Sequence, residues 1–285
     1  MVSARICDGN GILSYLGNMG GIIARSKFRL GDIYEIRLRT GQAIALETVR
    51  GRFIVDKIVS SDDISDCMRN FCHYSIHSFE KEMRDGYITL KGGHRAGFCG
   101  TAVMRNSVFE NIRDISSINI RIAREVIGCG EELRDIVFDD SFRGLLIAGK
   151  PMSGKTTVLR DLCRIIGNDF KLAVIDSRGE IAAVYGGVPQ NSIGQFTDVL
   201  NGYGKCEGIE IATRTLSPEF IACDEITGNP QSAKLCLNSG VKMIFTIHCG
   251  SLKQAMESNI ASTGAISHIA FLGGKTGQVT KTVTI

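Results

Sequence analysis

The second half of the chain alternates short apolar runs with segments of helical periodicity. The runs predict strands over residues 145–148, 172–175, 220–223 and 243–247, and the periodic segments predict helices over residues 157–166 and 207–216. Strands that alternate with helices are typical of an α/β domain with a mainly parallel sheet. Closing strands are expected over residues 266–272 and 278–285, whereas residues 186–206 lack periodicity and predict a long loop.

The first half of the chain has a different pattern, with period two. Apolar and polar residues alternate over 33–39, and short runs follow at 43–47 and 53–55, which predicts an antiparallel meander. Further elements are helices from Ser61 and over 75–84, and strands over 87–90 and 117–124. Because Gly128 and Gly130 suggest a linker, we expect a smaller α+β N-terminal domain over residues 1–128 and an α/β domain over residues 129–285.

The strand expected at 145–148 leads into a glycine-rich turn that matches the phosphate-binding loop, Gly, four free residues and Gly-Lys-Thr. Such a loop lets several backbone N–H groups reach a triphosphate. Lys155 would contact the β and γ phosphates, and the Thr156 hydroxyl would hold Mg²⁺. The alternative is a chance match, which the flanking strand and helix disfavour. The expected nucleotide-binding residues are Gly149, Pro151, Met152, Ser153, Gly154, Lys155, Thr156 and Thr157.

Polar residues directly follow the other predicted parallel strands, at the edge where open α/β sheets bind ligands. We expect Asp224 to hold Mg²⁺ and Glu225 to act as general base on the attacking water. The alternative for this pair is a helix cap. Asp176 and Glu180 either support the metal and the water or only cap a helix. His248 either senses the γ phosphate or is a structural histidine.

Several cations outside these motifs are further candidates. Arg121 lies opposite an apolar strand face and is either a solvated edge residue or a cation for nucleotide phosphates. Arg95 has the same two interpretations, and His94 beside it is expected to be structural. Arg214 either reaches a phosphate or a neighbouring subunit, or is a plain surface arginine. The polar candidates of the loop at 186–206 are Gln195, Thr197 and Asp198.

Composition limits the class of protein. Apolar residues make up 44% of the chain and charged residues 22%, as in ordinary globular proteins. The net charge of +3 is too small to indicate binding to nucleic acid. No apolar run approaches the ~18 residues of a spanning helix, and the N-terminus lacks the apolar stretch of a signal peptide, so we expect a cytoplasmic protein, which leaves docking on a membrane complex open. The ten cysteines include no Cys-x-x-Cys pair, which favours reduced thiols over disulfides or zinc.

Together these motifs resemble the stage III sporulation protein AA family, relatives of the ATPases that power type II and type IV secretion. The resemblance implies a RecA-like P-loop ATPase core, ATP and Mg²⁺ as cofactors, and a homo-oligomeric, hexameric ring with nucleotide between subunits. It also implies a position on the mother-cell membrane, docked on membrane-embedded proteins of a secretion-like sporulation channel. Besides the phosphate loop, the stretches that carry it are residues 90–97, 117–125, 176–182, 197–200, 217–219, 224–226 and 240–248.

The resemblance also implies roles for individual residues. Asp176 and Glu180 fall in the relatives' acidic box and His248 in their histidine box, while Arg121 and Arg214 fall near arginines that those ATPases aim at phosphates. Two departures bear on the rate of hydrolysis rather than on nucleotide binding. Ser177 stands where glutamate is usual, and Phe196 stands where arginine is expected.

We therefore expect an ATP-hydrolysing motor of a sporulation secretion-like channel. One alternative is a nucleic-acid-dependent RecA-like ATPase, against which the near-neutral charge and the lack of a long basic stripe argue. Another is a nucleotide-gated assembly scaffold with weak turnover. The expected catalytic residues are Lys155, Asp176, Glu180, Glu225, His248, Arg121 and Arg214.

Overall fold

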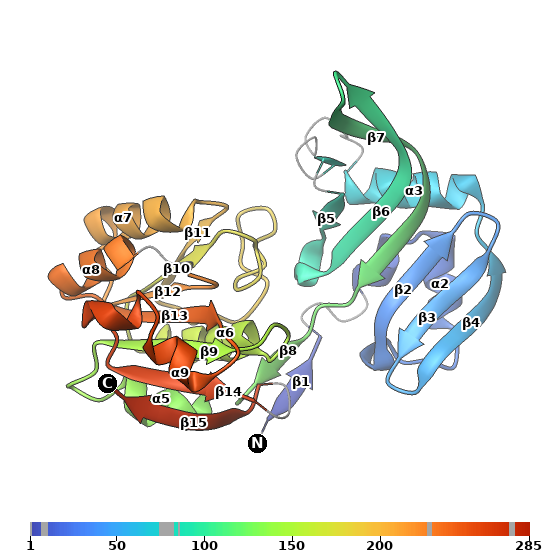
Figure 1. Ribbon diagram of the computed structural model, residues 1–285. Coiled ribbons are helices and arrows are strands. Elements are labelled where there is room, and N and C mark those ends of the chain that lie inside the picture. Colours follow the sequence, from blue (N-terminus) through green and yellow to red (C-terminus); the bar gives the residue numbers. More distant parts are fainter. Residues whose placement is uncertain (1, 7–10, 74–82, 85, 227–229, 274–276) are drawn as a thin grey trace. The chain divides into compact units, whose positions relative to one another are not determined.

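The structure is a computed structural model that describes residues 2–6, 11–73, 83–84, 86–226, 230–273 and 277–285. It contains two compact units (Figure 1). The first spans Arg5–Arg124, and the second spans Glu125–Ile285 together with Met1–Ala4.

The first unit is built on an antiparallel sheet with the order β4-β3-β2-β7-β6-β5. The meander predicted by the period-two pattern is confirmed, because β2 covers the expected residues and β3 and β4 follow it through tight turns. The elements of this unit are α1 (Gly11–Ser14), α2 (Asn18–Ala24), η1 (Leu30–Asp32), β2 (Ile33–Arg39), β3 (Ala43–Thr48), β4 (Gly51–Ile58), α3 (Ser61–Phe71), β5 (Tyr87–Thr89), η3 (Lys91–Gly93), β6 (Arg95–Arg105) and β7 (Val108–Arg121).

Helix α3 begins where the sequence predicts, and its cap explains why. Ser60 Oγ accepts a hydrogen bond from the Asp63 amide at 3.1 Å, and the Asp63 carboxylate accepts one from the Ser60 amide at 2.8 Å. This reciprocal pair satisfies amides that the first turn leaves without helical partners. The apolar side of the helix, with Ile64 and Phe71, is buried in the core of this unit. The helix expected over residues 75–84 lies almost entirely outside the described residues.

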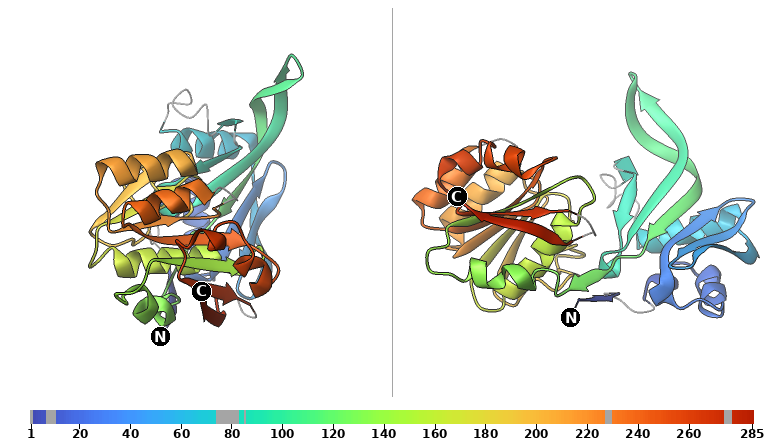
Figure 2. Two further views of the ribbon diagram at one scale, coloured as in Figure 1. Left: turned by 60° about the vertical axis from the view of Figure 1, so that its left-hand side comes forward. Right: turned by 60° about the horizontal axis from the view of Figure 1, so that its bottom comes forward.

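Strands β6 and β7 form a hairpin that is longer than expected. The sequence predicts a strand over 117–124, but β7 begins at Val108. Its neighbours are short: β5 pairs with Arg95–Gly97 and β2 pairs with Ser117–Arg121, so the outer part of the hairpin stands clear of the sheet (Figures 1 and 2). Most residues there are exposed on both faces, which removes the alternation that sequence analysis relies on.

The second unit is built on a seven-stranded sheet with the order β11-β10-β12-β13-β9-β14-β15. All neighbouring pairs are parallel except β14 and β15. Strand β1 (Ser3–Arg5) pairs separately with β8 (Glu125–Ile127). The remaining elements are η4 (Glu131–Leu133), α5 (Arg134–Val137), β9 (Gly144–Gly149), α6 (Lys155–Ile166), β10 (Leu172–Asp176), β11 (Thr197–Asn201), α7 (Lys205–Thr215), β12 (Phe220–Cys223), α8 (Pro230–Asn238), β13 (Lys242–His248), α9 (Leu252–Met256), η5 (Ala261–Thr263), β14 (His268–Leu272) and β15 (Val279–Thr284).

The central strands of this sheet are buried on both faces. Along β9, Leu145 and Ile147 pack with Leu159 of α6, while Leu146 and Ala148 face the opposite core cluster, which includes residues of α7 and α8. A strand covered on both sides is apolar at every position, which is why the sequence shows continuous runs here. The expected α/β fold, a parallel-sheet core preceded by a smaller α+β domain, is confirmed.

One expectation for a connecting segment is wrong. The stretch 186–206 contains β11, which pairs with β10 from Leu172↔Thr197 to Asp176↔Asn201. This edge strand is largely exposed and owes its conformation to its ladder with β10, so its own pattern is weak. The glycines that suggest a linker are fixed, because the Gly128 and Gly130 amides donate to the Asp161 carboxylate at 2.9 and 2.8 Å.

Candidate nucleotide site

The phosphate loop connects β9 to α6 at the carboxyl edge of the sheet. Gly154 lies in the left-handed region with φ 92°, a conformation that glycine adopts without a steric cost. Met152 also has positive φ, at 62°, and its side chain is 93% exposed. The loop therefore turns tightly and directs its one large apolar side chain into solvent.

The loop presents hydrogen-bond donors that the described residues leave unused. No described backbone group accepts from the amides of Gly154, Lys155 or Thr156, which open α6. The Ser153 hydroxyl is buried and has no described partner. Several donors at the positive end of a helix form a cradle for an anion. The residues present therefore fit the phosphates of a nucleotide.

Lys155 occupies the centre of this loop and is 4% exposed. Its ammonium donates to the carbonyls of Gly149 and Lys150 at 3.1 and 2.9 Å and lies 2.9 Å from His248 Nδ1. Burial lowers the pKa of Lys155, and the nearby carboxylates of Asp224 and Glu225 oppose that shift. The lysine is thus held against the loop. Its described partners are carbonyl and imidazole groups, which phosphate oxygens could replace when a nucleotide binds.

Asp224 lies opposite the loop, at the end of β12. Its carboxylate accepts a hydrogen bond from the Thr156 hydroxyl at 2.7 Å, so the two expected magnesium ligands are in contact. Hydroxyl and carboxylate oxygens are the donors that Mg²⁺ prefers, and the pair fits this ion. A third residue, Thr246 on β13, donates to the other carboxylate oxygen of Asp224 and is fully buried.

Glu225 is held on both sides of its carboxylate. Oε1 lies 2.7 Å from His248 Nε2, and Oε2 lies 2.7 Å from the Arg178 guanidinium. Burial favours a higher pKa for Glu225, but the His248 hydrogen bond and the Arg178 charge outweigh it and the pKa is lowered. The carboxyl group is therefore ionised at neutral pH, as a general base requires. Its backbone has φ 48°, an uncommon conformation that marks a constrained position.

The backbone of Glu225 is held as firmly as its side chain. Its amide donates to the Thr246 hydroxyl at 2.7 Å and to Asp224 at 3.1 Å, and the Lys205 ammonium donates to its carbonyl. His248 Nε2 as the protonated nitrogen satisfies both of its contacts, since Nδ1 then accepts from Lys155. A continuous polar chain thus joins Lys155, His248 and Glu225.

The two acidic candidates after β10 have a different setting. Asp176 is 2% exposed, and its carboxylate accepts from the amides of Glu180, Ile181 and Ala182 at 2.8, 3.1 and 2.8 Å. These contacts favour the capping interpretation, although the capped segment is a loop and not a helix. The carbonyl of Glu180 accepts from Arg160 at 2.6 Å.

The arginine candidates lie outside the elements that carry the phosphate loop, the acidic pair and His248. Arg214 lies in the last turn of α7, at the opposite end from Lys205, and its closest acid is Glu210 at 4.0 Å. Arg121 belongs to the first unit, where it is 3.8 Å from Glu35 and 76% exposed. Arg95 stands beside Arg121 in the sheet register. His94 is fully buried and accepts from the Ala123 amide at 2.9 Å, which agrees with a structural role.

Sequence reasoning missed Thr246, Arg178 and Lys205. One signal was available for Thr246, since it is a polar residue inside an apolar strand of the sheet. Nothing in the spacing of Arg178 or Lys205 points to Glu225, because only the fold brings their segments together. No helix in the described part of the chain is both long and apolar enough to cross a bilayer.

Comparison with known proteins agrees with this architecture. Residues 10–271 match the family described as "Sporulation stage III, protein AA". The chain is 34% identical over 234 residues to Stage III sporulation protein AA of Bacillus subtilis (strain 168), covering 79% of this chain and 76% of that protein. The fold resembles the pilus retraction motor PilT with bound ADP, with a TM-score of 0.57 and 13% identity over 90% of this chain and 77% of PilT. It also resembles the Legionella pneumophila ATPase DotB, with a TM-score of 0.53 and 16% identity over 84% of this chain and 72% of DotB.

Proposed function

This chain belongs to the stage III sporulation protein AA family, and we propose that it is a Mg²⁺-dependent ATPase that drives a secretion-like channel during sporulation. One observation carries the enzymatic part of the proposal. The Thr156 hydroxyl and the Asp224 carboxylate meet at 2.7 Å beside a loop of unused amide donors. A hydroxyl, a carboxylate and a phosphate cradle at one edge of a parallel sheet are what a nucleoside triphosphate with magnesium needs.

Different residues of the site have different roles in hydrolysis. The amides of the phosphate loop and Lys155 bind the triphosphate, and Thr156 and Asp224 hold magnesium. Magnesium, when bound, supplies positive charge that neutralises the phosphate oxygens. Glu225 orients a water and accepts its proton, and His248 connects the base to the lysine that contacts the phosphates. Asp176 and Glu180 keep the loop after β10 in place.

The assembly is also part of the proposal. We place nucleotide between the subunits of a homo-hexameric ring, with Arg121 and Arg214 stabilising phosphate charge across the subunit boundary. Both side chains are largely exposed, and their ion pairs among the described residues are long, 3.8 Å to Glu35 and 4.0 Å to Glu210, which supports such a role. The ring would lie on the cytoplasmic side of the mother-cell membrane, bound to membrane-embedded channel proteins.

The experiment is a phosphate-release assay with ATP and Mg²⁺. We expect Lys155→Ala and Glu225→Gln to abolish turnover, while Glu225→Gln still binds ATP. Lys253→Ala, which removes an exposed lysine outside the site, is the matched control and should turn over normally. Full turnover by Glu225→Gln would remove this residue as the base, and stimulation only by added DNA or RNA would favour a nucleic-acid-dependent ATPase.

A second candidate is a nucleotide-gated scaffold with weak turnover. The observation that favours it is the ion pair between Glu225 and Arg178, because a carboxylate that is paired with a guanidinium is less free to accept a proton from water. The absence of acidic and basic side chains at Ser177 and Phe196 points the same way. Single-turnover kinetics separate the two: a motor releases phosphate from bound ATP within seconds, whereas a scaffold retains ATP.

A further inference from the structure

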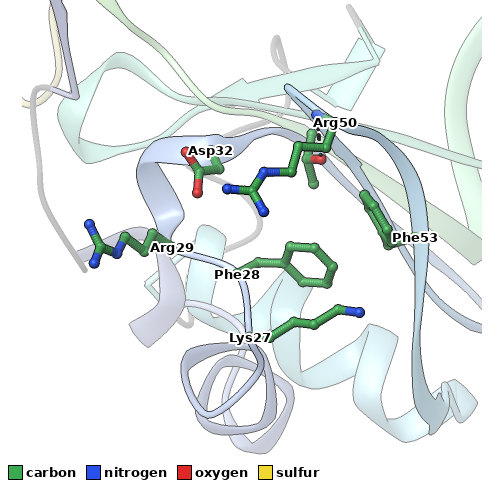
Figure 3. A pocket seen from close by; sticks show the side chains of 7 residues that line it. Lys27, Phe28, Arg29, Asp32, Arg50 and Phe53 are labelled. Carbon is green, nitrogen blue, oxygen red and sulfur yellow. Dashed lines mark hydrogen bonds between the residues drawn. The ribbon is translucent and has the colours of Figure 1, made fainter.

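The first unit contains a cavity that the ATPase proposal does not use. Its volume is about 590 Å³, within the usual range for ligand pockets. The segment between α2 and β2 forms one wall, with Lys27, Phe28 and Arg29, and the turn between β3 and β4 forms the other, with Arg50 and Phe53 (Figure 3). All of these residues belong to Arg5–Arg124, whereas the phosphate loop belongs to the other unit.

The charge of this cavity is unbalanced. Lys27, Arg29 and Arg50 line it together with a single carboxylate, that of Asp32. All three cations are exposed, and within the described part of the chain none forms an ion pair. Three cations whose charges are not neutralised by ion pairs create a positive potential that attracts anionic groups.

The cavity also offers apolar surface. The rings of Phe28 and Phe53 pack at 4.6 Å between centroids, and the Lys27 ammonium lies 5.4 and 5.5 Å from them. In the view of Figure 3, the Arg50 guanidinium and the Lys27 side chain lie on either side of the Phe28 ring, and Arg29 points away from it. A ligand would therefore meet cations at separate points around a small aromatic centre.

The backbone around the cavity is fixed before any ligand arrives. The Thr48 hydroxyl accepts from the Arg50 amide at 3.1 Å and donates to the Gly51 carbonyl at 3.1 Å, which holds the turn that carries Arg50. The Val49 amide donates to the Asp32 carbonyl at 3.0 Å and ties this turn to the opposite wall. A preformed site loses less entropy when it binds.

We propose that this cavity binds an acidic peptide segment of a partner protein, with carboxylates at Lys27, Arg29 and Arg50 and an apolar side chain on Phe28 and Phe53. Separated cations suit carboxylates spaced along a chain better than a single phosphate group, which needs donors that converge on one point. The pocket is thus a docking site independent of the ATPase reaction.

The test is fluorescence anisotropy of the full chain with a labelled Glu-Glu-Leu-Glu-Glu peptide at low salt. We expect binding that weakens as salt rises, and little binding of the Gln-Gln-Leu-Gln-Gln peptide. Arg50→Glu and Lys27→Glu should each weaken binding about tenfold or more. Arg39→Glu, the same charge change at an exposed arginine of the same sheet outside the cavity, should bind like the parent.

Three results would overturn the proposal: no binding by the parent chain, equal binding of the glutamine peptide, or equal weakening by Arg39→Glu. Phe53→Ala tests the apolar part, since it should weaken the leucine peptide but not a Glu-Glu-Ala-Glu-Glu peptide. A chain that carries Lys155→Ala allows ADP to be tested as a competitor when the phosphate loop lacks its lysine. Displacement of the peptide by ADP at lower concentration than by unlabelled peptide would reassign the cavity to nucleotides. None of these readouts depends on hydrolysis, so failure here leaves the ATPase proposal intact.

Discussion

Thr246 offers a sharp test of how the site is held, because sequence reasoning did not select it. The perturbation is Thr246→Val, which keeps the shape of the side chain and removes only the hydroxyl. That hydroxyl donates to the Asp224 carboxylate and accepts from the Glu225 amide at 2.7 Å, in a position that is fully buried. Its loss should therefore loosen both acidic residues of the site at once.

The magnitude follows from these contacts. A hydrogen bond to a charged group contributes about 1.5–3 kcal/mol and a neutral one about 0.5–1.5 kcal/mol. The loss is partial, because Asp224 still accepts from Thr156 at 2.7 Å and from the Glu225 amide at 3.1 Å. The added methyl group returns up to ~0.8 kcal/mol. We expect a net destabilisation of about 2 kcal/mol, which lowers Tm by about 4–8 °C in a domain of this size.

The assay is calorimetry of the nucleotide-free chain together with phosphate release. Turnover should fall about tenfold, the equivalent of about 1.4 kcal/mol in the barrier. Thr246→Ser keeps the hydroxyl and should retain most turnover. Thr215→Val is the matched control: among the described residues the exposed Thr215 hydroxyl donates to the Ile211 carbonyl of the same helix, so stability should change by less than ~0.5 kcal/mol. Parent-like stability and turnover in Thr246→Val would show that the Thr246 hydroxyl does not hold Asp224 and Glu225.

Two further predictions concern charge. Because the pKa of Glu225 is lowered from 4.5, the stability that its ionised form contributes is complete above that pH and is lost as the pH falls through the lowered pKa. The Tm of the parent should thus fall more steeply in acid than that of Glu225→Gln, with Arg178→Ala in between, and parallel curves would contradict this. Asp161→Asn weakens the acceptor for the Gly128 and Gly130 amides and breaks the 2.7 Å pair with Arg164. We expect about 2–3 kcal/mol lower stability in urea unfolding, and an unchanged midpoint would argue against it.

The sequence predicts those strands whose side chains are buried at alternate positions or at every position. Strands β2 and β12 have the predicted bounds, and β9 extends one residue beyond its prediction at each end. One face of β2 is buried, and both faces of β9 and β12 are buried. Strand β11 was missed because an edge strand depends on the ladder its neighbour offers. The outer hairpin of β6 and β7 was missed because both of its faces are exposed.

In the candidate site, too, some contacts follow from the sequence and others depend on the fold. The contact between Thr156 and Asp224 joins two motifs that both follow parallel strands at the carboxyl edge of one sheet, so sequence reasoning places them at the same edge. The partners of Glu225 do not follow, because Arg178 and Lys205 are brought to it only by the packing of β10, α7 and β12. Asp176 shows the reverse case, since a carboxylate at a strand end is occupied by three loop amides. Residue type and position predict which groups reach the edge, and only the fold decides what each one contacts.

Titration calorimetry with ATP and Mg²⁺ shows whether the phosphate loop, Thr156 and Asp224 bind a nucleotide together with magnesium. We expect a heat of binding for the parent chain and for Glu225→Gln, no binding by Lys155→Ala, and loss of the magnesium dependence in Asp224→Asn. Binding by Lys155→Ala with the parent's affinity, or no binding by the folded parent chain at millimolar magnesium, would contradict it.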